Sequence, residues 1–437
     1  MTLLMANGIL ELAFNIKKDG CIMTDTLPWQ LRDYNTYLEI VRNAAQADEE
    51  HILIAPFVEP TSLSEGVLVG AVVSVKATFD VKGYATTAGT KLLGQVPAEQ
   101  DADAVARLKA AGASILGHTN MTELAYSGVG LNPHYGTPRN PLNAERIPGG
   151  STSGGAVSVA MGLADIALGT DTGGSLRIPA AFCGLVGFKP TQQSVPRKGC
   201  APLSDSLDSV GPIAEDVATC RLAWQVLSDS QNTDINVQAM TLIVPENFGV
   251  DQLDDSIKHG FESVIAQIKA NGFNVEQMSI DAFEDYKQLP VWQFSAIESR
   301  RHYGQLLDLE SEQLDPRVRK RIARGASVSD QEFADTCWRR QQLISQFHKQ
   351  FDNAVFLLPT VACCAPKFSD FAMDEDFDRI NLLCLRNTTF ANVIDGCSIS
   401  LPFSYQDEPM GLLLTAMNGQ DTALLALAEQ IESVLRR

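Results

Sequence analysis

Apolar and polar positions follow two patterns that alternate along this chain. Continuous apolar runs, typical of buried strands, occur at 71–76, 114–116, 166–168 and 355–358. Helical periodicity occurs at 103–111 and 255–271, and small apolar residues after two glycines predict a further helix at 157–163. Because strands that alternate with helices usually form one covered sheet, we predict an α/β fold with a mixed, partly parallel central sheet and helices on both faces.

The chain of 437 residues shows no internal repeat and no low-complexity linker. A chain of this length can hold two or three domains, but α/β architectures of this size also form one compact unit. We expect a single domain over residues 23–437, with a helix-rich pocket region at about 250–350. Three aromatic residues of that region, Trp292, Phe294 and Tyr303, are available either to wall a pocket or to fill the core.

The formal net charge of -19 argues against a nucleic-acid or anionic-membrane surface, because both require clustered lysine and arginine. The one basic cluster, at 317–325, has the spacing of a solvated helix face. The apolar segment 1–16 lacks a basic leader and is too short to span a membrane. We therefore expect neither a nucleic-acid partner nor a membrane partner.

Nine cysteines at irregular spacing favour reduced thiols and a cytoplasmic location over a disulfide framework. We interpret the adjacent Cys363 and Cys364 as buried small residues, with pocket lining as the alternative. The sequence contains no matched pair of CxxC motifs, no HExxH and no carboxylate-rich loop. We therefore predict no metal and no other cofactor.

Two serines in glycine-rich turns carry the candidate chemistry. Ser151 lies in PGGSTSGG and Ser175 in GTDTGGSLR, and 175 minus 151 leaves a spacing of 24 residues. The helix and strand predicted between the two turns can bring them side by side. Successive backbone amides from Thr172, Gly173 and Gly174 to Ser175 could hold a developing oxyanion, and the Ser175 hydroxyl would be placed to attack.

The glycine-rich turns also allow other interpretations. Either turn alone could be an ordinary glycine turn of an α/β protein. A phosphate-binding loop is disfavoured, because the chain has neither GxxxxGK[ST] nor a strand-GxGxxG-helix unit. The GxSxG nucleophile elbow is also absent here, since Leu176 and Arg177 follow the serine.

A serine nucleophile needs a base, and no histidine is a convincing one. Four histidines lie in polar segments that favour surface placement, at 51, 259, 302 and 348, while His118 falls in the apparent helix start GHTNMTEL. Lys76 ends the strand predicted at 71–76, where burial would lower its pKa and allow a neutral amine to accept a proton. Lys82, beside Gly83, fits better with a lysine that reaches solvent.

Long ordered motifs extend over roughly residues 40–435. They are VSVKATFDVKG, DADAVARLKAAGASILGHTNMTELAYSG, the two serine turns, GLVGFKPT, FLLPT, NTTFANVIDGCSISLPF and PMGLLLTA. Through these motifs the chain resembles the amidase signature family of serine hydrolases. The part of the chain that resembles this family begins only after Met23, so we expect residues 1–22 to be disordered or absent from the natural protein, with Met23 as the natural start.

The resemblance implies an amidohydrolase with a Ser, cis-Ser, Lys triad and an acyl-enzyme intermediate. Ser175 matches the nucleophile, Ser151 the bridging serine whose preceding peptide is cis, and Lys76 the base. The resemblance also assigns the amides of residues 172–175 to the oxyanion hole, and we expect Asp171 and Arg177 to brace the turn. A small amide substrate is expected, with a homodimer left open.

The expected substrate contacts are Tyr126, Ser127 and Gly150. Two positions depart from the family pattern. Ala77 stands where an acidic residue usually follows the lysine, which should favour a neutral Lys76, and His118 stands where lysine is common. For His118 we expect an effect on stability or substrate preference.

Two further functions stay open at the level of the sequence. One is a glutaminase resembling the A subunit of tRNA-dependent amidotransferases, which passes ammonia to a partner protein. The other is a non-catalytic binding protein on the same fold. The intact set of Lys76, Ser151 and Ser175 argues against the second.

Overall fold

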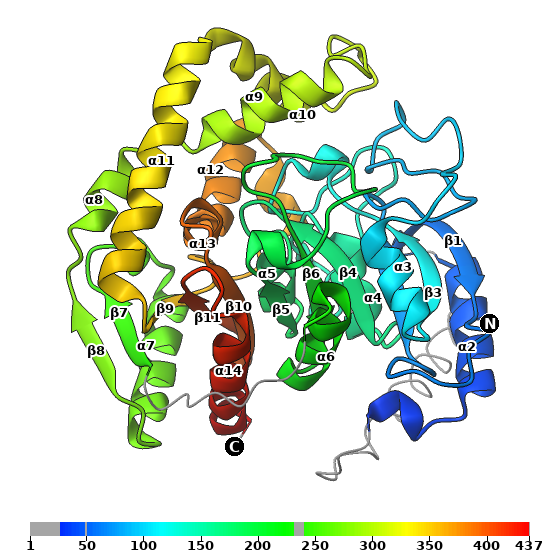
Figure 1. The fold of residues 1–437 in the computed structure, drawn as a ribbon, viewed down its shortest axis with the longest axis horizontal. Helices are drawn as coiled ribbons and strands as arrows, with labels where there is room; N and C mark the ends of the chain where they lie inside the picture. The colour runs from blue at the N-terminus through cyan, green and yellow to red at the C-terminus, as the bar shows by residue number, and fades with distance from the viewer. Residues whose placement is uncertain (1–26, 49, 231–239, 437) are drawn as a thin grey trace.

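A computed structural model describes residues 27–48, 50–230 and 240–436 of the protein. The expectations for residues 1–22 and for Met23 as the natural start lie outside the described residues. In the described part, the chain is built on one mixed sheet of eleven strands in the order β1-β3-β2-β4-β6-β5-β10-β11-β9-β7-β8. The predicted α/β architecture is therefore confirmed (Figure 1).

Parallel and antiparallel pairs are both present in the sheet. The β2 strand pairs in parallel with β3 and β4, and β7 pairs in parallel with β8 and β9. The other pairs are antiparallel. The strand bounds are β1 Leu53–Glu59, β2 Val72–Lys76, β3 Ser114–Thr119, β4 Ile166–Asp171, β5 Val186–Lys189, β6 Ser209–Ala214, β7 Thr241–Pro245, β8 Val275–Met278, β9 Ala354–Pro359, β10 Cys397–Tyr405 and β11 Glu408–Ala416.

Helices cover both faces of this sheet. Their bounds are α2 Tyr34–Gln46, α3 Asp103–Ala110, α4 Ser153–Ala160, α5 Arg177–Phe182, α6 Val217–Ser228, α7 Asp255–Ala270, α8 Ala282–Lys287, α9 Trp292–Tyr303, α10 Pro316–Arg324, α11 Asp330–Phe351, α12 Asp374–Leu385, α13 Thr389–Val393 and α14 Asp421–Leu435. The region at 250–350 contains α7 to α11 and one strand, β8, which agrees with the helix-rich segment expected there. In Figure 1, α9, α10 and α11 stand together at the top of the molecule.

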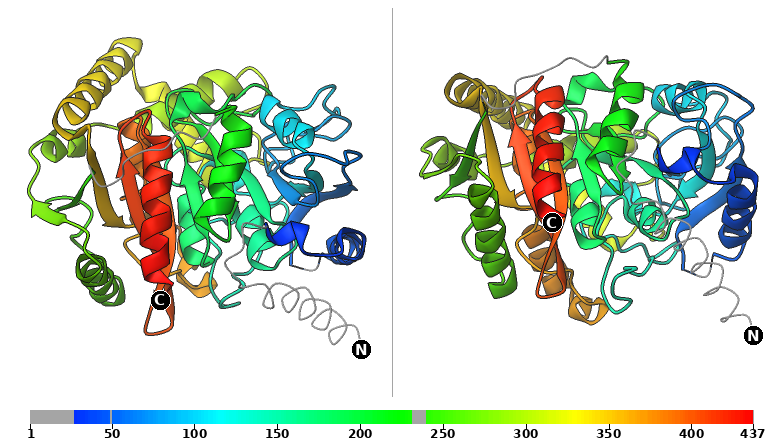
Figure 2. Two further views of the ribbon diagram at one scale, coloured as in Figure 1. Left: turned by 60° about the horizontal axis from the view of Figure 1, so that its bottom comes forward. Right: turned by 90° about the horizontal axis from the view of Figure 1, so that it is seen from below.

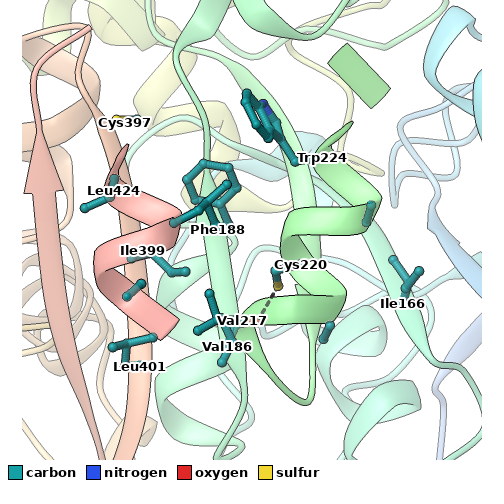
Figure 3. Close-up of a cluster of buried hydrophobic side chains, with 14 of the residues drawn as sticks. Ile166, Val186, Phe188, Val217, Cys220, Trp224, Cys397, Ile399, Leu401 and Leu424 are labelled. Atoms are coloured by element: carbon teal, nitrogen blue, oxygen red, sulfur yellow. Dashed lines mark hydrogen bonds between the residues drawn. The ribbon is translucent and has the colours of Figure 1, made fainter. Parts of the chain in front are cut away.

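The largest cluster of buried apolar side chains lies between the sheet and α3, α6, α7 and α14. Figure 2 shows α6 and α14 side by side on this face of the sheet. In Figure 3, Phe188 of β5 lies between α14 and α6, where Cys220 and Trp224 lie, and Ile399 of β10 lies beside α14. The Cys220 thiol donates to the carbonyl of Val186 at 3.5 Å, so the small polar group of this cluster also has a partner.

The opposite face is covered by two further clusters. One joins α2, α4 and α5 to the strands at the β1 end of the sheet. The other joins α8, α9, α11 and α13 to β7, β9 and β11, and it contains the stacked Phe248 and Phe283. Phe294 lies in this second cluster with no exposed area, which makes it a core residue.

The strands expected from apolar runs are all present, and β3 and β4 each extend three residues beyond the expected run. The run at 114–116 extends to Thr119, so His118 lies inside β3 and not at a helix start. The Nε2 atom of His118 lies 2.9 Å from the carbonyl of Phe79, and its ring packs edge-on against Phe57. Position 118 is paired with Val75 of β2, and this parallel ladder continues the strand beyond the apolar run.

The sheet brings the two candidate turns together. Because β2 and β4 are parallel neighbours, their carboxyl ends lie at the same edge, with Lys76 ending β2 and Asp171 ending β4. The turn that carries Ser151 leads directly into α4, which packs on β2 and β4. Gly154 lets the start of α4 approach the segment before β1, since a Cβ there would lie 2.2 Å from the carbonyl oxygen of Ile52.

Candidate active site

Lys76 is fully buried and contacts the first candidate serine. Its Nζ atom lies 2.8 Å from the Oγ of Ser151 and 2.7 Å from the Oγ1 of Thr170. Burial lowers the pKa of the Lys76 amine to about 8, against the attraction of the carboxylates of Asp208 and Asp171. A substantial fraction of this lysine is therefore neutral near pH 7 to 8 and can accept a proton.

Ser151 and Ser175 lie in adjacent, interconnected turns. The Gly150–Ser151 peptide bond is cis. The amide of Thr152 donates to the carbonyl of Ser175 at 3.3 Å, which joins the two turns. Both serines are buried, with Ser175 4% exposed and facing the cavity described below. Among the described residues, no hydrogen bond joins the two hydroxyls, so a proton transfer between them requires rotation of a serine side chain.

The turn at 172–175 offers backbone donors, but not all the expected ones. The amide of Gly174 donates to Oδ1 of Asp171 at 2.8 Å, so this member of the expected oxyanion hole is already occupied. Gly174 has a φ of 140°, a value that favours glycine and points its amide inward. Within the described part of the chain, the amides of Thr172, Gly173 and Ser175 have no hydrogen-bond acceptor. These three groups remain available to a substrate oxygen.

A buried ion pair supports this turn from below. Arg177 donates from Nε and Nη2 to the two carboxylate oxygens of Asp171, at 3.0 and 2.8 Å, and neither side chain is exposed. Burial alone would raise the pKa of Asp171, but the Arg177 charge and these hydrogen bonds hold it at about 2. Asn392 adds a further donor to the same carboxylate at 3.0 Å. The pair therefore braces the turn, as expected from the sequence.

Asp208 is a site residue that the sequence analysis missed. Its Oδ1 accepts from the Thr172 hydroxyl at 2.5 Å, and its Oδ2 accepts from the amides of Leu203 and Ser204. Burial raises the pKa of Asp208 to about 6, while these donors act in the opposite direction. The signal in the sequence is an acidic residue directly before the apolar strand at 209–214, a place where a carboxylate is buried only with partners.

A cavity of about 1000 Å³ opens above Ser175. Tyr126 and Ser127, two of the expected substrate contacts, line it together with Thr172 and Gly173. Gly150, the third expected contact, does not: a Cβ there would lie 2.7 Å from Gly130, so its role is close packing. Gly150 therefore packs closely against Gly130 and is not among the residues that line the cavity.

Of the aromatic residues and cysteines that were candidates for lining the pocket, some line the cavity and others are buried in the core. Trp292 of α9 lines the cavity, whereas Tyr303 is 1% exposed in an apolar cluster with Tyr126. Cys363 is buried with its sulfur 4.0 Å from that of Cys384, and neither Cys363 nor Cys364 is among the cavity-lining residues. The interpretation of Cys363 as a buried small residue is confirmed, while Cys364 is partly exposed.

The basic cluster at 317–325 forms α10, as its spacing predicted. Its apolar side chains Val318 and Ile322 are buried, and Arg317, Lys320, Arg321 and Arg324 border the cavity. One face of α10 is therefore buried, and the other carries the cations that border the cavity. The sequence pattern predicted the helix but not its position over Ser175.

The two residues that depart from the family pattern, Ala77 and His118, are both buried. Ala77 is fully buried in the apolar cluster that contains Met121 and Leu203. His118 is buried as well, and burial lowers its pKa to about 4, so it is neutral at pH 7. Neither residue lines the cavity. An effect of His118 on the sheet is consistent with its contacts.

Metal clusters and membrane-spanning helices are both absent from the described ranges. Over residues 27–48, 50–230 and 240–436, no group of three or more histidine, cysteine, aspartate and glutamate residues is arranged to hold a metal ion. In the same ranges, no helix is long and apolar enough to cross a membrane.

A buried lysine bonded to one serine, a second serine at the base of a cavity and free amides beside it form the kind of site that serine hydrolases use. The family described as Amidase matches residues 35–425. The chain therefore belongs to the amidase family and is an amidohydrolase that acts on amide carbon-nitrogen bonds.

Individual relatives support the same conclusion. The chain is 32% identical to 2-amino-5-chloromuconic acid deaminase of Comamonas testosteroni, covering 85% of this chain and 82% of the relative. It is 31% identical to the A subunit of glutamyl-tRNA(Gln) amidotransferase from Symbiobacterium thermophilum, covering 85% and 84%. Among solved structures, an amidase superposes with a TM-score of 0.82 at 28% identity, covering 98% of this chain and 99% of that one.

Proposed function

We propose that the protein hydrolyses a small amide through an acyl-enzyme on Ser175, with Lys76 as the base and Ser151 as the bridging group. The observation that carries this proposal is the 2.8 Å contact between Lys76 Nζ and Ser151 Oγ in a fully buried setting. A buried lysine with a pKa of about 8 is matched to proton transfer near neutral pH.

In the proposed first half-reaction, neutral Lys76 takes the proton of Ser151 while Ser151 takes that of Ser175. The Ser175 Oγ then bonds to the amide carbonyl carbon. As the tetrahedral intermediate collapses, the carbon-nitrogen bond breaks and the same chain returns the proton to the leaving nitrogen. In the second half-reaction, water attacks the ester, and the products are a carboxylic acid and Ser175.

The negative charge of the tetrahedral intermediate would lie at the amides of Thr172, Gly173 and Ser175. Asp208 holds Thr172 through its hydroxyl, and the Asp171–Arg177 pair holds the rest of the turn. These donors are fixed before substrate binds, and preorganised donors of this kind contribute strongly to acyl transfer.

A fluorophosphonate probe and amide turnover test the proposal together. Wild type should be labelled on Ser175, and Ser175→Ala should lose labelling and lower kcat/KM by about 10⁴-fold or more. Ser127→Ala is a cavity-lining serine variant that should still be labelled on Ser175. Undiminished turnover by Ser175→Ala would contradict the mechanism.

A second candidate is a glutaminase that passes ammonia to a partner protein. The observation in its favour is the 31% identity to the A subunit of an amidotransferase over most of both chains. The purified chain decides between the two functions. Hydrolysis of amides by the chain alone supports the free amidohydrolase, and turnover only with a co-purifying partner supports the glutaminase of a larger complex.

We also propose a cytoplasmic location and no nucleic-acid partner. The irregular cysteines and the net charge of -19 support these two statements. A homodimer remains an expectation that light scattering of the purified chain tests directly. A non-catalytic role is disfavoured, because the lysine and both serines are present and in place.

A further inference from the structure

The cavity above Ser175 carries a charge opposite to that of the chain. Seven lysine and arginine side chains but only three aspartates line it, an excess of four positive charges. The whole chain has a formal net charge of -19. A positively charged cleft concentrates anions, even when the rest of the protein surface is negatively charged.

Several of these cations are already paired with carboxylates. Arg317 lies 3.3 Å from Asp374, and Lys320 and Arg321 both face Asp378, at 3.6 and 3.1 Å. Arg379 pairs with Asp376 at 2.9 Å. Such pairs leave little affinity for a further anion, so the excess charge is concentrated on the cations that lack a partner.

Arg386 differs from the paired cations. Its Nε donates to Oδ1 of Asn387 at 3.2 Å, and Asn387 is in turn held by the carbonyls of Gly249 and Pro359, at 3.0 and 2.7 Å. Its Nη2 is buried, yet has no hydrogen-bond partner among the described residues. A buried charged donor without an acceptor is unfavourable. The carboxylate of Asp251, which also lines the cavity, attracts the Arg386 charge, but no ion pair joins the two side chains in the described structure.

Arg386 lines the cavity above Ser175. Arg386 follows Leu385, and the Leu385 side chain lies close to Gly173. A Cβ added to Gly173 would be 3.4 Å from Cδ2 of Leu385. The hydroxyls of Thr388 and Thr389 donate to the Gly173 carbonyl, at 2.5 and 3.1 Å. The segment that carries Arg386 is thus fastened to the turn that would bind the oxyanion.

A second cation of the cavity also lacks an ion pair in the described structure. Arg324 of α10 lies over the ring of Trp292, with its guanidinium carbon 4.1 Å from the ring centroid. This stacking holds the guanidinium at the mouth of the cavity while leaving its donors free for an anion.

We propose that the substrate of Ser175 is a small amide that carries a carboxylate, and that the Arg386 guanidinium binds this carboxylate, with Arg324 adding to the attraction. The inference rests on the proposed hydrolase function and names its substrate class. Guanidinium groups suit this task, because their charged donors bind carboxylates more strongly than neutral donors do.

Matched pairs of amides test the inference on the whole chain. The monoamides succinamate, glutaramate and adipamate are compared with butyramide, valeramide and hexanamide, in which a methyl group replaces the carboxylate. For at least one pair, wild-type kcat/KM should be roughly tenfold or more higher with the carboxylate. Added salt should raise KM for the carboxylate member only.

Variants assign that preference to a residue. Arg386→Gln should lower the ratio of the two kcat/KM values by roughly ten- to a hundredfold, mainly through KM, and Arg386→Lys should restore part of it. Arg301→Gln removes the same charge from an exposed ion pair with Asp330 outside the cavity lining, and should change the ratio by less than about threefold. Thermal unfolding checks that each variant folds.

The outcomes separate this inference from the function on which it rests. Equal turnover of both members of every pair overturns the carboxylate class while leaving the hydrolase intact. So does labelling of Ser175 without turnover of any carboxylate amide. Equal effects of Arg386→Gln and Arg301→Gln overturn the assignment to Arg386. No labelling and no turnover overturn the hydrolase proposal itself. If Arg386→Gln fails to fold, the wild-type ratio and its salt dependence still decide.

Discussion

The floor and the outer wall of the cavity are built in opposite ways. The floor, which we define as Lys76, Ser151, Thr172, Ser175 and Asp208, is held by buried hydrogen bonds between strand ends. The outer wall, defined as α9, α10 and α12, packs on the core through apolar residues but carries ion pairs at its surface, such as that of Arg317 with the 86% exposed Asp374. Buried, satisfied groups fix a geometry, while exposed pairs contribute little energy and adapt easily. We infer that the floor determines the reaction and the wall determines the substrate.

The largest expected effect comes from removing the base in the floor. Lys76→Ala should lower kcat/KM by about 10²- to 10⁴-fold, because no other group in contact with Ser151 can take its proton. Lys82→Ala, an exposed lysine six residues away, should stay within about twofold. Steady-state kinetics on the best amide measure both. Equal losses of kcat/KM in the two variants would contradict the assignment of Lys76 as the base.

The pH dependence of the reaction examines the same lysine without mutation. Only neutral Lys76 accepts a proton, and its pKa is about 8, so kcat/KM should rise with pH and level off above about pH 8. Below that pKa the loss should be about tenfold per pH unit, because the protonated fraction dominates. Protonation of Asp208, with a pKa of about 6, should steepen the fall in the most acidic part of the range. A profile that is flat from about pH 6 to pH 9 would exclude Lys76 as the base.

A smaller effect is expected from the carboxylate that supports the oxyanion turn. Asp208→Asn replaces the acceptor of the Thr172 hydroxyl with a weaker one and should lower kcat by about 10- to 100-fold, less than the loss of a direct oxyanion donor. The matched control is Asp205→Asn, at an exposed position nearby, which should have little effect. A role in folding alone would lower the melting temperature without changing kcat of the folded enzyme.

The smallest effect is expected in the outer wall. Arg317→Gln breaks the exposed pair with Asp374 and should change the free energy of unfolding by less than about 1 kcal/mol. Its effect should fall on KM more than on kcat, because the residue borders the cavity away from the reacting groups. Chemical denaturation and kinetics measure the two quantities. A large loss of kcat would mean that wall and floor are coupled.

The same contrast explains what the sequence could predict. The sequence around the floor residues has clear patterns. Lys76 ends a strand that is buried throughout, and the glycine-rich turns indicate that backbone segments approach each other closely. The α/β class and the helix at 317–325 were also predictable. The extension of β3 through His118 was not, because polar residues there are paired by the sheet ladder and give no apolar signal.

The missing parts of the site depend on contacts between distant segments or on local turn geometry. Asp208 meets Thr172 across 36 residues, and Gly174 loses its free amide to Asp171 through local turn geometry that the glycine count cannot specify. The place of α10 above Ser175 follows from the packing of a whole helical region. Pattern alone identifies such residues as polar or basic, while the fold decides what they face.

The most direct test of the central claim is to locate the covalent intermediate. An activated anilide is mixed with the enzyme, the reaction is quenched with acid within the first turnover, and the chain is analysed by intact mass and peptide mass spectrometry. The account predicts one acyl group per chain, carried by the peptide that contains Ser175 and bound at that serine. An acyl group on Ser151, or turnover with no acylated chain at any quench time, would contradict it.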